Sequence, residues 1–163
     1  PAPRPPRPPH SRPRVPRCGG ESAGAVLAKA REAANDGRLE EARAWCERAI
    51  AADKMDPVHH YLLAIVEREM GDEDAARRSL GRALYLDPRF ALAHFVLGHL
   101  DLSAGRRADA ARSLTNALGS LRDYGDEDAP PESEGLTAGR LREIVGSLLA
   151  TLSDERRLAG GRR

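Results

Sequence analysis

The stretch from Asp87 to Ala117, DPRFALAHFVLGHLDLSAGRRADAARSLTNA, decides the fold. Its first half spaces apolar side chains as one face of a helix and ends at Ser103-Ala104-Gly105. A second run with helical spacing begins almost at once, at Ala108. Two helices joined by so short a turn must lie antiparallel, so the stretch predicts a helical hairpin.

The same pattern occurs three times at a constant offset along the chain. We place the copies at 23–56, 57–90 and 91–124. Two further positions match in the second and third copies only: His60 corresponds to His94, and Tyr61 corresponds to Phe95. When the copies are aligned, equivalent positions form columns, and in five columns all three copies carry the same kind of residue. One column is glycine, three contain small residues and one contains medium-sized apolar residues. They are Gly37, Gly71 and Gly105; Ala42, Ala76 and Ala110; Ala49, Ala83 and Ala117; Ala30, Ala64 and Gly98; Cys46, Leu80 and Leu114.

Each column has a physical role in a stack of hairpins. The glycines fall between the two helices, where a positive backbone dihedral is expected. The small residues fall where helix axes must approach closely, and a larger side chain would push the axes apart. Pro57 and Pro88 fall where the chain enters a new hairpin, and a missing amide donor costs little there.

A helical hairpin that recurs at this offset, with these features, resembles the tetratricopeptide repeat, whose period is about 34 residues. The resemblance implies an all-α superhelical stack, with a linker at 1–21, three repeats over 22–124, an acidic loop at 125–136, a C-terminal capping helix at 137–154 and a frayed tail at 155–163. It also implies that the first helices of successive hairpins line an inner groove that binds a peptide or a helix.

The resemblance maps the inner groove onto particular side chains. Leu27, Arg31 and Val58 are expected to line it, and we expect the partner to contact seven further residues in the second and third copies. The groove is therefore predicted to be mostly apolar, so that either a partner or another part of the chain must cover it. The seven residues are Tyr61, Ile65, Arg68, Leu92, Phe95, His99 and Leu102.

The last segment can cover apolar surface in two ways. Thr137 is placed to cap a helix whose apolar stripe includes Leu141, Val145 and Leu152. A terminal repeat needs such a helix as a cap, and this is the first interpretation. In the second interpretation, the helix or the acidic loop lies in the inner groove and competes with a partner.

The ends and the overall charge give weaker indications. Residues 1–20 are rich in proline and arginine and contain no acid, which is typical of a stiff linker, with an SH3-type ligand as the alternative. A formal net charge of +1 gives no general argument for a nucleic-acid or membrane partner. No signal peptide or membrane span is recognisable, so we expect a cytoplasmic protein.

The sequence predicts no catalytic, cofactor or metal site. Cys46 stands in an apolar column and is interpreted as a buried hydrophobe, whereas Cys18 lies in the linker. His60 and His94 occupy a large-residue packing position, which favours packing over metal binding. Phosphate-binding loops and nucleophile motifs are absent.

Two segments suggest a narrower family. YLDPRFALAHFVLGHLDLSAGRRADAARSLTNAL at 85–118 and PESEGLTAGRLREIV at 131–145 resemble the C-terminal repeat region of CheR-type chemotaxis methyltransferases. That resemblance implies a protein-binding module in bacterial chemosensory or two-component signalling. No residue matches the methyltransferase domain. The alternatives are the binding half of an active methyltransferase with S-adenosylmethionine bound upstream, and a stand-alone scaffold that self-associates.

Overall fold

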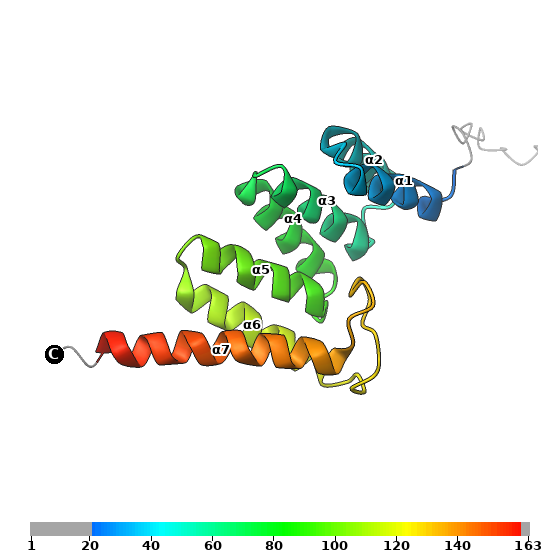
Figure 1. The fold of residues 1–163 in the computed structure, drawn as a ribbon. Coiled ribbons are helices and arrows are strands. Elements are labelled where there is room, and N and C mark those ends of the chain that lie inside the picture. Colours follow the sequence, from blue (N-terminus) through cyan, green and yellow to red (C-terminus); the bar gives the residue numbers. More distant parts are fainter. Residues whose placement is uncertain (1–20, 161–163) are drawn as a thin grey trace, which may run out of the picture.

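The computed structural model describes residues 21–160, and all its regular elements are helices. Figure 1 shows them as successive antiparallel pairs followed by one long helix. Over the described residues there are seven: α1 (Ala23–Asn35), α2 (Leu39–Ala52), α3 (Pro57–Glu69), α4 (Glu73–Leu86), α5 (Ala91–Ser103), α6 (Arg107–Leu121) and α7 (Ala138–Gly160).

The three predicted hairpins are present, as α1/α2, α3/α4 and α5/α6. Their turn glycines occupy equivalent bends, with φ of 74° at Gly37, 83° at Gly71 and 71° at Gly105. Each bend is closed in the same way, since the amide after the glycine donates to a carbonyl five residues earlier, as from Asp72 to Glu67 at 2.9 Å. This is the left-handed helix end that favours glycine.

The predicted packing columns form the core. All three alanines of the second-helix column, Ala42, Ala76 and Ala110, are completely buried. The medium-sized column is buried as well, which confirms that Cys46 packs as a hydrophobe equivalent to Leu80 and Leu114. A methyl group added at Gly98 would come within 2.8 Å of the Leu114 side chain, so these helices approach as closely as the column predicts.

The two equivalent histidines pack against the connections between hairpins. The imidazole Nε2 of His60 lies 3.0 Å from the Lys54 carbonyl oxygen, and that of His94 lies 2.8 Å from the Pro88 carbonyl oxygen. Both carbonyls precede the histidine by six residues, so the contact repeats with the hairpin. The buried histidines therefore find their polar partners in the backbone of these connections, as a packing role requires.

Helix α7 closes the stack as a cap. Val145 and Leu152 of α7 are buried in one cluster with Leu114 and Ala117 of α6. Thr137 caps the helix, since its hydroxyl oxygen accepts a hydrogen bond from the Arg140 amide at 3.3 Å. The predicted end at residue 154 differs from the model, where α7 extends to Gly160. Residues 154–160 contain good helix formers, namely glutamate, arginine, leucine and alanine, which explains the extension.

Candidate functional site

The first helices α1, α3 and α5 define the candidate site, which we call the inner groove. The repeat offset places its side chains in rows across the three helices. One row contains Leu27, Tyr61 and Phe95, and the next contains Arg31, Ile65 and His99. These rows lie on the concave side expected for the first helices of stacked hairpins.

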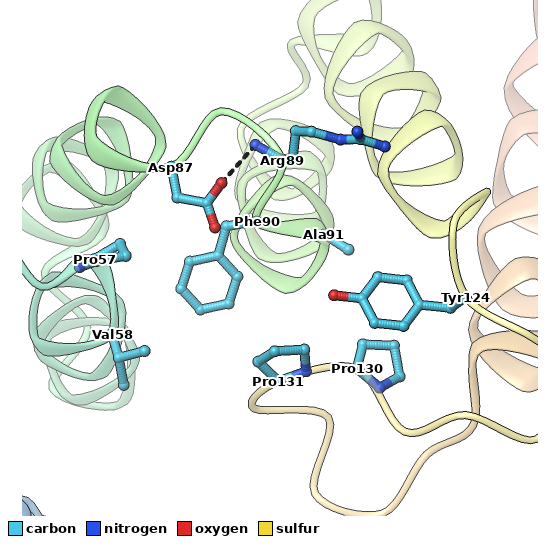
Figure 2. A pocket seen from close by; sticks show the side chains of 9 residues that line it. All are labelled: Pro57, Val58, Asp87, Arg89, Phe90, Ala91, Tyr124, Pro130 and Pro131. Atoms are coloured by element: carbon cyan, nitrogen blue, oxygen red, sulfur yellow. Dashed lines mark hydrogen bonds between the residues drawn. The ribbon is translucent and has the colours of Figure 1, made fainter.

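The loop between α6 and α7, residues 122–137, crosses this groove. Its tip segment, Pro130 to Glu134, rises from the base of α7 towards α1 and α3 (Figure 1). Figure 2 shows Pro130 and Pro131 facing the rings of Phe90 and Tyr124, with Val58 of α3 opposite. Pro130 is buried although it belongs to a loop. The entrance of the groove is therefore closed by the chain itself.

The far end of the tip segment is held by charge. One guanidinium nitrogen of Arg31 donates to both carboxylate oxygens of Glu132, at 2.9 and 2.8 Å. The Glu132 side chain is only 15% exposed, so much of its hydration is replaced by this contact. Glu134 lies beside α1 and α3, where it lines a pocket with Ala34 and Ile65. The tip segment is thus bonded to α1 and shares pockets with residues of α3 and α5.

Tyr61 lies beneath this cover. Its ring is tilted against that of Phe90 with centroids 4.9 Å apart, and the residue is 6% exposed. Burial raises the pKa of the Tyr61 phenol to about 12, and the nearby Glu132 carboxylate acts in the same direction. Leu92 is buried as well. Tyr61 is thus buried in the free chain, and its contact with a partner stays a prediction that requires the loop to move.

The other half of the groove is more open. Phe95 is half-buried and meets the edge of His99 in a T-shaped contact, with ring centroids 4.7 Å apart. Ile65, Arg68 and Leu102 are half-buried, and His99 is exposed. Partial burial of its ring lowers the pKa of His99, and the positive charge of Arg68 lowers that pKa further. Phe95 and Leu102 also pack against the cluster beneath α7, so they support the cap.

The base of the loop is fastened independently of its tip. Arg142 of α7 donates to the carbonyl oxygens of Leu121, at 2.7 Å, and Tyr124, and its guanidinium pairs with the Asp126 carboxylate at 2.5 Å. The Ala138 amide donates to the Asp128 carbonyl oxygen at 2.7 Å. These contacts hold the two ends of the loop together at the start of α7.

Sequence reasoning missed the residues that receive the tip segment. Phe90 and Tyr124 are the last residues of two predicted copies and are themselves separated by one repeat offset. Because the two aromatic residues occupy equivalent positions in successive copies, the sequence could have indicated an apolar site at the hairpin ends. Glu132 had no such signal, because its partner Arg31 lies 101 residues earlier.

Other chemistry is not assembled in the described part of the chain. Within residues 21–160, no three histidine, cysteine, aspartate or glutamate side chains gather in a way that could hold a metal ion. Burial raises the pKa of the Cys46 thiol to about 11, which keeps it protonated and unreactive. In the same range, none of the helices combines the length and the apolar character needed to cross a bilayer. Cys18 and the Pro/Arg-rich segment lie outside the described residues.

Comparison with protein families supports the repeat assignment. Residues 60–90, which span most of the second predicted copy, match the family model named tetratricopeptide repeat. The fold is that of a tetratricopeptide repeat domain. Among curated proteins, none is significantly similar to the chain in sequence.

Solved structures of this class share the architecture. The Yersinia enterocolitica secretion chaperone SycD, in complex with a peptide of the translocator YopD, superposes with a TM-score of 0.70 at 19% identity, over 82% of this chain and 93% of SycD. The tetratricopeptide domain of P58(IPK) gives 0.69 at 22% identity, over 85% of this chain and 34% of that one. The first such domain of Spaghetti (RPAP3), bound to the HSP90 peptide SRMEEVD, gives 0.60 at 16% identity, over 78% and 93%.

These comparisons bear differently on the two resemblances. They support the tetratricopeptide fold expected from the constant repeat offset. They do not include a CheR-type methyltransferase among the structures compared above, so the chemosensory assignment stays a prediction from the sequence. At these identities the structural likeness establishes the fold and no particular partner.

Proposed function

We propose that this chain is a non-catalytic module that binds other proteins by taking an extended peptide into the inner groove. One observation carries the proposal: the groove already holds a peptide segment, the tip of its own loop, which lies there as consecutive turns and pairs with Arg31. A groove that accepts one segment of chain beside its first helices offers contacts that another peptide can use. Complexes of SycD and RPAP3 with peptides show that folds of this architecture bind such ligands.

The open half of the groove gives the proposal a test. Short random peptides displayed on phage are selected on the whole chain, and the selected peptides are measured against two charge reversals. Arg68→Glu changes an inner-groove residue on α3, whereas Arg78→Glu changes an exposed residue on α4, the second helix of the same hairpin. We expect Arg68→Glu to weaken binding and Arg78→Glu to leave it unchanged. Selected peptides that bind both variants equally would place the binding surface elsewhere.

A narrower form of the proposal sets the module in bacterial chemosensory signalling, as the repeat region of a CheR-type receptor methyltransferase. Its support is the sequence resemblance of residues 85–118 and 131–145. In that setting the partner is a signalling protein or the methyltransferase domain itself. Isothermal titration of the chain with a purified CheR-type catalytic domain, and with a chemoreceptor cytoplasmic fragment, tests this form. Absence of binding to both would remove it and leave the general proposal standing.

A further inference from the structure

The tip segment has backbone angles and a buried hydroxyl that are energetically unfavourable in themselves. Glu132 has φ of 64° and Glu134 has φ of 52°, both in the left-handed region that residues other than glycine rarely adopt. The Ser133 side chain is buried, and its hydroxyl has no hydrogen-bond partner among residues 21–160. Such features persist only where surrounding contacts impose them. The segment forms two turns of its own, with the Ser133 amide donating to the Pro130 carbonyl oxygen and the Leu136 amide to the Ser133 carbonyl oxygen, and the groove contacts offset the cost of the left-handed residues.

The loop is built so that its tip can leave while its base stays. The base is fixed by Arg142 and by the amide of Ala138, which bonds within the loop. The tip is attached to the groove by the ion pair between Glu132 and Arg31, and its prolines line one pocket with Phe90. Arg31 is 41% exposed at its side chain, so a competing anion can approach it from solvent.

The occupied site also specifies the chemistry of a competitor. Apolar rings at Phe90 and Tyr124 receive the prolines, and the guanidinium of Arg31 receives a carboxylate two residues after the first proline. Arg68 adds a second positive charge further along the groove, close enough to Tyr61 to affect its pKa. A ligand with prolines or other apolar residues followed by acids reproduces these contacts. A basic peptide would meet Arg31 and Arg68 with like charge.

We propose that residues 130–134 are a built-in competitor of the partner, and that the partner presents an acidic, proline-containing segment that displaces them from Arg31 and Phe90. This inference rests on the proposed function and adds the partner's chemistry and its regulation. A tethered segment competes at a high effective concentration, so the apparent affinity for any partner falls by the fraction of chains whose groove is open.

The test uses the whole chain and a labelled peptide of residues 129–136, APPESEGL, added in solution. Fluorescence anisotropy measures its affinity for the wild type and for Glu132→Gln, which loosens the tethered copy. Glu127→Gln is the matched control, because Glu127 is an exposed acid of the same loop. We expect Glu132→Gln to bind the peptide up to about fivefold more tightly than wild type, and Glu127→Gln to match wild type. Equal affinity of all three chains, or no binding to Glu132→Gln, would overturn the inference.

Two further arms test the chemistry of recognition in the Glu132→Gln background. The peptide APPQSQGL, and the native peptide with the double variant Arg31→Gln, Glu132→Gln, should both bind weakly. Retained binding in either arm would contradict recognition of the acid by Arg31. In the unmodified chain, a peptide selected from the library should expose the amides of Ser133 and Leu136 to hydrogen exchange while the amides of Ala138 and Gly139 stay protected. Peptides that bind the open half of the groove without exposing Ser133 would uphold the proposed function and refute the competition.

Discussion

Arg31 of α1 and Glu132 of the α6–α7 loop are in direct contact although 101 residues separate them, and this ion pair joins the first hairpin to the segment that precedes the cap. One guanidinium nitrogen donates to both carboxylate oxygens. The contact crosses the groove formed by the first helices, so it reports on whether the groove is open or covered.

A double-mutant cycle on this pair should show modest coupling. We expect Arg31→Ala and Glu132→Ala to share a coupling energy of about 1 kcal/mol or less in urea unfolding, because the Arg31 side chain remains 41% exposed and solvent screens the charges. Coupling well above that range would mean that the loop is an integral part of the folded core and not a displaceable cover.

The turn glycines should be sensitive to alanine. At Gly71, with φ of 83°, an alanine side chain strains the bend, and we expect Gly71→Ala to destabilise the domain by roughly 1 kcal/mol. Gly81 is the matched control, since it lies exposed within α4 with open space around it. There the same substitution should stabilise by about 0.5–1 kcal/mol. Equal effects at both sites would argue against the left-handed bend.

Overpacking the repeat columns should weaken the stack. Ala76 is completely buried between helices, so Ala76→Leu is expected to cost roughly 1–3 kcal/mol in chemical unfolding. Ala44→Leu, at an exposed position of α2, adds the same atoms outside the core and should change stability little. If Ala76→Leu is tolerated as well as Ala44→Leu, the helix axes are further apart than the complete burial of Ala76 implies.

The pH dependence of stability should contain a contribution from His99. Its pKa is lowered in the folded chain, so as the pH falls through about 6.5 the unfolded chain binds a proton that the folded chain does not. Acidification from neutral pH should therefore destabilise the wild type more than His99→Gln, whose remaining histidines are unchanged. Melting temperatures recorded across this pH range check the difference. Parallel curves would contradict the partial burial of His99 beside Phe95 and Arg68.

Substituting an aromatic residue of the inner groove should change the stability of the domain as well as its binding. Tyr61 is buried against Phe90, and Phe95 packs towards α7, so truncating either to alanine should lower the melting temperature. Loss of binding in Tyr61→Ala or Phe95→Ala would therefore not by itself identify a ligand contact. Arg68 and His99, which are less buried, are better positions for testing ligand contact alone.

The repeat was readable from the sequence because its determinants are local and recur. Gly71 and Ala76 each appear with equivalents at a fixed offset, and each equivalent has the same physical role. Thr137 and the stripe containing Val145 were readable for the same reason, since a cap and helical periodicity act within a few turns. These features led to the hairpins, the core columns and the capping helix.

The position of the loop was not readable in that way. It was weighed only as one of two interpretations, because an acidic segment with prolines gives no periodic signal. Its placement depends on the contact of Glu132 with Arg31 and on the prolines meeting Phe90, both distant in sequence. Tyr61 was assigned to an exposed groove because its column indicates the inner face but cannot indicate what covers that face.

The account depends most on the tip segment lying in the groove, and proton–proton Overhauser contacts of the Phe90 ring in the free chain measure this directly. The Phe90 ring should show cross-peaks to the Tyr61 ring, which tests only the hairpin stack, and to Pro130 or Pro131, which tests the covering loop. Cross-peaks of both kinds are predicted. Contacts to Tyr61 without any to the prolines would show an intact stack with an open groove, and would contradict the account.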